Sequence, residues 1–306
     1  MIENSKYDFY TVSKMKGSSA NYNQPKFCPR AAWNSEASTF LNILEHDHIL
    51  DSFFVDIDNT VIVPVEHLNK TIVLYVTTDN LTKIDINVTY DLTAIFVNTD
   101  GNLLFSDRGT RGVYKLTLNE LKIEPIRMFN ATCYGLFVLD DNTIYCSLYS
   151  LHQVVTVTFN DSSNTSSLVA DELKYPYGIF VDENLNLYVA DSGNNRIQCF
   201  QFKSEYLEGT TVAGTSNTIE LDNPTSITLD ADKYLFIVDS NNHRIIASGP
   251  DGFRCILGCF RTYGSRRSQL HNPLALNFDN NGNIFILDKG NQLIQKLHLT
   301  TNSCSK

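Results

Sequence analysis

The stretch "GIFVDENLNLYVADSGNNRIQCF" (178–200) decides the fold, because it recurs along the chain. Copies in the same frame are "SITLDADKYLFIVDSNNHRIIAS" (226–248), "ALNFDNNGNIFILDKGNQLIQKL" (275–297) and "AIFVNTDGNLLFSDRGTRGVYKL" (94–116). Two more degenerate copies begin at residues 135 and 53. The chain therefore contains six repeats, which start near residues 53, 94, 135, 178, 226 and 275.

The composition of the repeats separates strands from helices. A repeat length of about 41 to 49 residues is typical of propeller blades or of helical arrays. Each copy consists of short runs rich in Ile, Val, Leu, Phe and Tyr that are separated by Asp, Asn and Gly, and the apolar residues lack helical spacing. The fourth copy contains four such runs, "GIFVD", "LNLYVAD", "RIQCFQF" and "TTVAG". We therefore predict an all-β fold, a six-bladed β-propeller of four-stranded antiparallel blades.

The two ends of the chain indicate how the ring closes. After the third strand of the last repeat, near "IQKLHL", only "TTNSCSK" remains, which is too short for a fourth strand. The segment "EASTFLN" (36–42) has a suitable apolar pattern and precedes the first blade. We predict that this N-terminal strand completes the last blade. Residues 26–306 are then a single propeller, and residues 1–25, rich in Ser, Asn and Lys, are a flexible tail.

The segment "YPYGIFVDENLNLYVADSGNNRIQCF" (175–200) resembles the NHL repeat, in which Pro, Gly and an apolar strand precede "LYVAD" and "N-x-R-I". The fourth and fifth copies match closely, the sixth lacks the Arg, and the first three match in outline. The pieces "CPRAAWNSEASTF", "GFRCILGC" and "LTTNSC" are similar to NHL-repeat proteins predicted in bdelloid rotifers. The resemblance implies an NHL-type six-bladed propeller. It does not imply one function, because the family includes binding scaffolds, sensors and a lyase branch.

Polar residues recur at fixed offsets around the turn that follows the second strand. They are Asp107, Asp191, Asp239 and Asp288, together with Arg196 and Arg244. An Asp that ends a strand can accept hydrogen bonds from turn amides, and the Gly and Asn beside it tolerate left-handed dihedral angles. Recurrence in several blades is typical of a structural device. We therefore interpret these residues as turn-stabilising rather than metal-binding.

Candidate ligand-binding residues stand just before each first strand, where propeller loops line the mouth of the central channel. By offset they are Asp51 or Ser52, Thr93, Tyr134, Tyr177, Thr225 and Leu274. The NHL-family amidating lyases place zinc-binding His residues at this offset after a Pro, where this chain has Tyr177, Thr225 and Leu274. Zinc needs at least three N, S or O ligands, and the seven His residues of this chain form no replacement cluster in the sequence. We expect no metal, no cofactor and no enzymatic activity.

Four of the seven cysteines suggest disulfides. Cys28 and Cys304 flank the two strands at the ring closure, so they either form a bridge that stabilises the fold by about 5 kcal/mol or remain two unpaired thiols. Cys255 and Cys259 are too far apart in an extended strand, but they can pair if Gly258 turns the chain. The other cysteines, Cys133, Cys146 and Cys199, are interpreted as small core residues.

The compartment stays open between two alternatives. Six N-glycosylation sequons are about as many as chance predicts: Asn69, Asn80, Asn87, Asn130, Asn160 and Asn164. Their confinement to the first three blades, with the possible bridge, favours an extracellular glycoprotein. The N-terminus has no secretory signal, which favours the cytoplasm, and no apolar run is long enough to span a membrane.

The charge balance narrows the choice of partners. A net charge of -10 makes nucleic acid an unlikely ligand, although one segment (253–271) carries four Arg residues, Arg254, Arg261, Arg266 and Arg267, near Phe260 and Tyr263. We predict a monomeric, non-catalytic scaffold whose loops bind a protein or a small ligand. The alternatives are an amidating-lyase-like or other hydrolytic propeller, an RNA-binding propeller and a sensor domain of a larger receptor.

Overall fold

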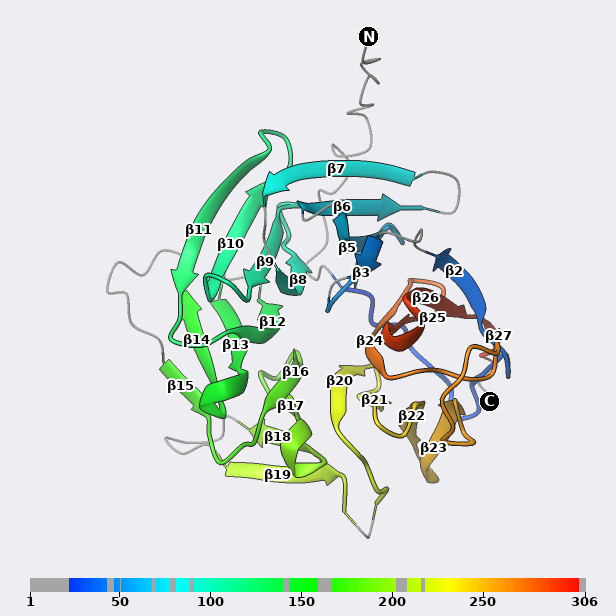
Figure 1. The fold of residues 1–306 in the computed structure, drawn as a ribbon. Coiled ribbons are helices and arrows are strands. Elements are labelled where there is room, and N and C mark those ends of the chain that lie inside the picture. The colour runs from blue at the N-terminus through cyan, green and yellow to red at the C-terminus, as the bar shows by residue number, and fades with distance from the viewer. Residues whose placement is uncertain are drawn as a thin grey trace.

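The chain forms six blades around a central axis, as predicted (Figure 1). Five blades have four strands, and blade 1 has an additional short strand. The computed structural model describes residues 22–42, 47–49, 51–67, 70–77, 81–88, 91–139, 143–158, 167–201, 208–215 and 218–302. All blades are antiparallel, and their first strands face the axis. Apart from three short 3-10 turns, the described residues with regular structure are in strands.

The strands of the first three blades follow one another along the chain. Blade 1 contains β3 (Asp47–Ile49), β4 (Phe54–Val55), β5 (Val61–His67), β6 (Lys70–Val76) and β7 (Leu81–Val88). Blade 2 contains β8 (Leu92–Val97), β9 (Leu103–Asp107), β10 (Gly112–Thr117) and β11 (Lys122–Met128). Blade 3 contains β12 (Cys133–Val138), β13 (Thr143–Leu148), β14 (Gln153–Thr158) and β15 (Ser167–Ala170). Blade 1 is irregular, because both β3 and β4 pair with β5.

The remaining blades follow the repeat more closely. Blade 4 contains β16 (Pro176–Val181), β17 (Leu187–Asp191), β18 (Arg196–Gln201) and β19 (Glu208–Ala213). Blade 5 contains β20 (Pro224–Leu229), β21 (Leu235–Asp239), β22 (Arg244–Gly249) and β23 (Gly252–Leu257). Blade 6 takes β24 (Pro273–Phe278), β25 (Ile284–Asp288) and β26 (Leu293–Leu297) from the C-terminal end.

The N-terminal strand closes the ring. Strand β2 (Ser38–Asn42) pairs antiparallel with β26 as the outer strand of blade 6, which confirms the prediction for residues 36–42. Figure 1 shows β2, near the N-terminal end of the colour scale, beside the C-terminal strands of this blade. An additional pair, β1 (Ala32–Trp33) with β27 (Leu299–Thr301), lies outside the blades and was not predicted. Ring closure thus rests on two strand pairings.

Small residues allow the first strands to approach one another around the axis. The residue that follows each predicted mouth residue is small in every blade: Ser52, Ala94, Gly135, Gly178, Ser226 and Ala275. A Cβ atom on Gly178 would lie 2.7 Å from the carbonyl oxygen of Thr225 in the next blade, and one on Gly135 would clash with the carbonyl oxygen of Tyr177. These positions therefore determine how tightly the blades pack.

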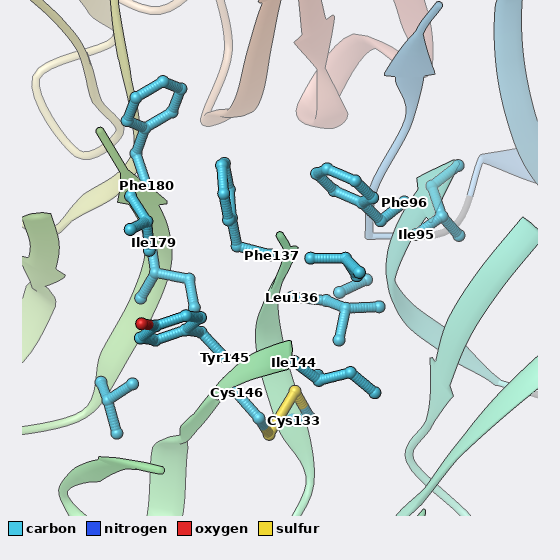
Figure 2. Packing of buried hydrophobic residues seen from close by; sticks show 14 of the residues in the cluster. Ile95, Phe96, Cys133, Leu136, Phe137, Ile144, Tyr145, Cys146, Ile179 and Phe180 are labelled. Carbon is cyan, nitrogen blue, oxygen red and sulfur yellow. A yellow bond between two sulfur atoms is a disulfide. The ribbon is translucent and has the colours of Figure 1, made fainter. Parts of the chain in front are cut away.

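Aromatic rings fill the channel two residues further along the first strands. Phe54, Phe96, Phe137 and Phe180 are buried neighbours in blades 1 to 4, with centroid separations of 5.1 to 5.3 Å. Figure 2 shows three of these rings, those of Phe96, Phe137 and Phe180, projecting toward one another. Tyr22 adds a fifth ring, 5.3 Å from those of Phe137 and Phe180. The channel is therefore packed with aromatic side chains at this level.

Residues 22–25, which were predicted to belong to a flexible tail, lie against the propeller. Residues 1–21 lie outside the described residues, but Tyr22 packs into the channel, and Asn23 Nδ2 donates hydrogen bonds to the carbonyl oxygens of Asp56 (2.7 Å) and Phe278 (3.0 Å). Gln24 Nε2 donates to the carbonyl oxygen of Asp230 at 3.1 Å. Residues 22–25 are therefore part of the propeller, because they satisfy polar groups at the ends of three blades.

The cysteine pattern differs from the sequence interpretation in blade 3. Cys133 and Cys146, expected to be separate core residues, form a disulfide between the adjacent strands β12 and β13, as Figure 2 shows. Their 13-residue separation spans a hairpin, so the two Cα atoms lie 5.5 Å apart. Cys255 and Cys259 also form a disulfide with Cα atoms 5.6 Å apart, since Gly258 turns the chain with φ of +73°. Cys199 is a buried thiol.

Of the residues that the structure describes, none belongs to a helix that is long and apolar enough to cross a membrane.

Candidate ligand-binding site at the channel mouth

Five of the six predicted mouth residues line one cavity on the axis. This cavity has a volume of about 110 Å³ and is bounded by the first strands of all six blades. Its lining includes Asp51, Tyr134, Tyr177, Thr225 and Leu274. The offset within the repeat therefore located residues that the ring brings together from five blades.

The two threonines are involved in blade packing. Thr93 is 1% exposed, and its hydroxyl donates to the carbonyl oxygen of Cys133 at 2.7 Å and lies 2.8 Å from the hydroxyl of Ser106. The Thr225 hydroxyl donates to the carbonyl oxygen of Leu274 at 2.9 Å. The structure therefore places Thr93 outside the cavity lining, in contrast to the prediction, and places Thr225 in the lining with its hydroxyl bonded to the next blade.

Four tyrosines cluster on the side of the mouth formed by blades 3 and 4. The ring of Tyr134 lies 4.8 Å from that of Tyr149 and 5.0 Å from that of Tyr177, measured between centroids. Tyr149 also lies 4.9 Å from Tyr175, whose ring has an edge contact with His152 at 4.7 Å. Tyr175 is exposed (40%), so the cluster runs from the cavity to the surface. We call Tyr134, Tyr149, Tyr175 and Tyr177 the tyrosine cluster.

Charged side chains flank the tyrosine cluster on the side of blades 1, 2 and 6. Asp51 lies between two cations, since it forms an ion pair with Arg108 and another with Lys289 at 3.0 Å. Arg108 also pairs with Asp91 at 3.0 Å, and its guanidinium lies 5.6 Å from the centroid of the Tyr134 ring. The charges at this side of the mouth therefore compensate one another and hold Arg108 against the tyrosine cluster.

Burial raises the pKa of two hydroxyls of the tyrosine cluster. Desolvation, together with the negative charge of Asp51, raises the pKa of Tyr177 well above its ordinary value. Desolvation also raises the pKa of Tyr149, with a smaller contribution from Tyr134. Tyr149 and Tyr177 therefore offer aromatic faces and uncharged hydroxyl groups.

Blades 5 and 6, with the loop that joins them, carry a second aromatic group outside the cavity lining. The rings of Tyr263 and His271 are 5.1 Å apart, and both are near His243, at 5.7 Å and 6.0 Å. His243 Nδ1 accepts a hydrogen bond from the backbone of Asn272 at 3.2 Å. Desolvation and the charge of His271 lower the pKa of His243. Among the described residues, no three His, Cys, Asp or Glu side chains lie close enough together to hold a metal ion.

The recurrent Asp residues of blades 4 and 5 stabilise turns through the same set of contacts. Asp191 accepts hydrogen bonds from the backbone of Lys174 (2.6 Å), from Asn194 Nδ2 (2.9 Å) and from Arg196 Nε (2.6 Å). In blade 5, Asp239 is fully buried and accepts the corresponding three bonds, the last from Arg244 Nε at 2.6 Å. Each carboxylate thus joins its own turn to the segment that leads into the blade.

Blades 2 and 6 retain this carboxylate and its upstream backbone donor, but another donor takes the place of the arginine. Asp107 accepts hydrogen bonds from the backbone of Asp91 at 2.8 Å and from the backbone and hydroxyl of Thr110 at 2.7 and 2.6 Å. Asp288 accepts one from Gln295 Nε2 at 2.5 Å, in a blade where Leu293 stands at the position of Arg196. All four turn carboxylates therefore accept hydrogen bonds from their own blades, as expected of turn-stabilising residues.

Several predicted sites fall where the structure is not described. Cys304 lies outside the described residues, whereas the backbone N–H of Cys28 donates to Asn302 Oδ1 at 2.8 Å, near the C-terminal end of the described chain. Asn130 is exposed, and Asn87 lies in β7. The other four sequons lie outside the described residues: Asn69, Asn80, Asn160 and Asn164.

Arg108, Tyr149 and Lys289 are mouth residues that the sequence analysis missed. They share one offset, directly after the last residue of the second strand in their blades. The same offset carries Ser192 in blade 4 and Ser240 in blade 5. Aligning the repeats at the turn Asp and reading the next residue would have found them, because this turn lies on the same side of each blade as the start of its first strand.

Comparison with known families supports the fold assignment. The NHL repeat model matches residues 173–200, in the part of the chain that forms most of β16 to β18 of blade 4. With the six-bladed architecture, this match supports the NHL-repeat propeller family. No curated protein matches the chain.

Solved structures with similar folds have diverse functions. Virginiamycin B lyase from Staphylococcus aureus is 15% identical with a TM-score of 0.60, and the match covers 85% of this chain and 98% of the lyase. A gluconolactonase from Xanthomonas campestris is 14% identical (TM-score 0.65, covering 93% and 99%). An auxiliary nutrient binding protein from Bacteroides ovatus is 15% identical (TM-score 0.66, covering 92% and 76%). At these identities the likeness shows the fold alone.

Proposed function

We propose that this protein is a non-catalytic binding module that takes a peptide segment of a partner across the mouth of its channel. The observation that carries the proposal is the tyrosine cluster, which joins the cavity to the surface through ring contacts of 4.8 to 5.0 Å. Tyrosines offer large, rigid contact area at low cost in conformational entropy, and are enriched at recognition surfaces.

The size of the cavity favours a ligand that lies across the mouth. Pockets for drug-sized ligands usually have volumes of about 300–1,000 Å³. The cavity has a volume of about 110 Å³, and its lining includes the packed aromatic rings of four blades and Tyr22. One side chain of a ligand fits this space, while the rest of an extended segment contacts Tyr149 and Tyr175.

The charged groups at the mouth support binding rather than acid–base chemistry. The carboxylate that lines the cavity, Asp51, already forms ion pairs with Arg108 and Lys289. The four turn carboxylates are already engaged by backbone and side-chain donors of the turns. Because these carboxylates are already paired within the protein, they help to fix the shape of the surface that a ligand would contact.

The proposal can be tested by peptide display. A library of random 12-residue peptides is selected on the wild-type protein, and the dissociation constants of the selected peptides are measured by fluorescence anisotropy. We expect the double variant Tyr149→Ala, Tyr175→Ala to weaken their binding at least tenfold. The matched control is Met128→Ala, Leu168→Ala, because these side chains are about half exposed (52% and 51%) on β11 and β15. The proposal is wrong if no peptide is selected or if both double variants bind alike.

We further propose that the protein acts in an oxidising, extracellular compartment. Support comes from two cysteine pairs at disulfide distance among the described residues, since disulfides are rare in cytosolic proteins. Intact-mass measurement after alkylation, with and without reduction, of protein from its native source is expected to show both bridges. Seven alkylated thiols without reduction would instead favour the cytoplasm.

A further inference from the structure

The loop between β23 and β24 concentrates exposed aromatic and basic side chains. Phe260 is 81% exposed and Tyr263 is 67% exposed, the two highest values among the large hydrophobic side chains of the described residues. Arg261, Arg266 and Arg267 are exposed in the same loop. We call these five side chains the arginine–aromatic surface. Burying such apolar area is favourable, so rigid exposure of both rings indicates a surface that a partner covers.

The loop is held in one conformation from both ends and from the middle. The Cys255–Cys259 disulfide closes its start, and the backbone of Gly264 donates to the carbonyl oxygen of Leu270 at 3.2 Å. The N-terminal segment contributes as well, because the backbone of Ala37 donates to the carbonyl oxygen of Arg267 at 2.8 Å. A preformed loop loses little conformational entropy when it binds a partner.

Within the described part of the chain, the three arginines Arg261, Arg266 and Arg267 form no ion pair, although the chain as a whole has a net charge of -10. The arginines of the regular turns differ, because Arg196 and Arg244 each pair with an Asp at 2.6 Å. The three loop arginines, beside exposed rings, form a surface complementary to a ligand that is both acidic and apolar.

We propose that the arginine–aromatic surface binds an acidic peptide segment of a partner protein, one that alternates carboxylates with aromatic or aliphatic side chains. Arginine binds carboxylates in a bidentate geometry, and an exposed Phe or Tyr supplies the apolar anchor. This surface and its ligand go beyond the tyrosine cluster, which carries no such excess of positive charge. A short acidic peptide can bind to the loop alone, so the negative charge of the rest of the propeller does not repel it strongly.

Nucleic acid is the less suitable ligand for the same surface. Binding a phosphate backbone depends on a broad basic face, and each phosphate contact adds to the salt dependence. Here the basic side chains come from one loop of a chain with an excess of negative charge. A polynucleotide would extend beyond the loop onto that body, whereas a peptide of about ten residues would not.

Fluorescence anisotropy with defined probes tests the proposal. The first probe is a labelled 10-residue peptide of alternating Glu and Phe, and the second has Lys in place of Glu. A labelled 10-nucleotide poly(U) is the third. We expect only the Glu–Phe peptide to bind, with a dissociation constant that rises at least tenfold in Arg261→Glu, Arg266→Glu and severalfold in Phe260→Ser, Tyr263→Ser.

The matched control reverses two charges elsewhere. The variant Lys115→Glu, Lys122→Glu changes the net charge equally, but its positions lie in β10 and β11 of blade 2. We expect it to bind the Glu–Phe peptide within twofold of the wild type. Equal weakening by both charge reversals, tighter binding of poly(U), or no binding of the Glu–Phe peptide would each overturn the proposal. Loss of the Tyr149 and Tyr175 side chains is expected to leave this binding unchanged, which distinguishes the two surfaces.

Discussion

Blades 5 and 3 make the same turn after their second strands by different means. In blade 5, Asp239 accepts hydrogen bonds from the backbone of Asp222, from Asn242 Nδ2 and from Arg244 Nε. Blade 3 has Leu148 at this position, and a disulfide joins its first two strands. Its turn carries Tyr149 and His152 at the mouth. Residues that follow the repeat pattern, such as Asp239, thus stabilise the fold. Residues that depart from it, such as Tyr149, are candidates for binding.

The largest expected effect comes from breaking the regular turn. The Arg244 side chain is only 5% exposed, so in the variant Asp239→Ala it stays buried and loses its carboxylate partner. Removing one partner of a buried ion pair typically costs about 3–5 kcal/mol. Urea unfolding followed by circular dichroism measures the loss. Asp191→Ala should cost less, because the Arg196 side chain is 27% exposed and reaches water more easily.

The control for these variants is Asp251→Ala, at the exposed tip of the β22–β23 hairpin. We expect the free energy of unfolding of this variant to stay within about 0.5 kcal/mol of the wild type. If Asp191→Ala and Asp239→Ala lost the same stability as Asp251→Ala, the turn carboxylates would not be structural.

The first turns of four blades each contain a buried Asp, but within the described part of the chain only two of these carboxylates have an ion-paired cation beside them. Asp56, Asp182, Asp230 and Asp279 occupy one offset, and each Oδ1 accepts hydrogen bonds from two turn amides. Lys233 lies 3.3 Å from Asp182 Oδ2, and Lys296 lies 3.2 Å from Asp279 Oδ2. Among the described residues, no Lys, Arg or His forms an ion pair with Asp56 or Asp230, and the Oδ2 atoms of these two carboxylates are buried without a hydrogen-bond partner. Burial therefore disfavours their charged forms.

This difference predicts a pH dependence of stability. Desolvation raises the pKa of Asp56 and of Asp230 from 3.8 to about 6. Between these values the folded state binds more protons than the unfolded state, so their contribution to stability is present below about pH 4 and is lost as the pH rises through 6. The loss is on the order of 2 kcal/mol for each group.

Asparagine variants isolate this contribution. The stability of Asp56→Asn, Asp230→Asn relative to the wild type is expected to increase from pH 4 to pH 7 in urea unfolding experiments. Asp182→Asn serves as the comparison, because it removes an ion pair with Lys233 and gives no such gain. A pH-independent difference between the double variant and the wild type would contradict the prediction.

The sequence predicted the parts of the molecule that repeat. Strand runs, the turn Asp and the ring-closing segment were predictable because their pattern is local or can be compared between copies. The Cys133–Cys146 disulfide was missed, since each residue alone is typical of a buried strand position. The tyrosine cluster was found only in part, through Tyr134 and Tyr177. Tyr149 and Tyr175 join it through the meeting of two adjacent blades, which no single repeat contains.

Apart from the Asp251→Ala control, the smallest expected effect on stability is that of Tyr149→Ala. This side chain is half-buried and packs against other rings rather than holding a turn, so its loss should cost about 1 kcal/mol or less in urea unfolding. Binding of the peptides selected on the wild type should nevertheless weaken severalfold. Asp191→Ala is the opposite case, since it should destabilise the protein while leaving peptide affinity unchanged in native conditions. A Tyr149→Ala variant that lost stability as Asp239→Ala does would make the tyrosine cluster a packing device of blade 3 and remove the main support for a binding surface there.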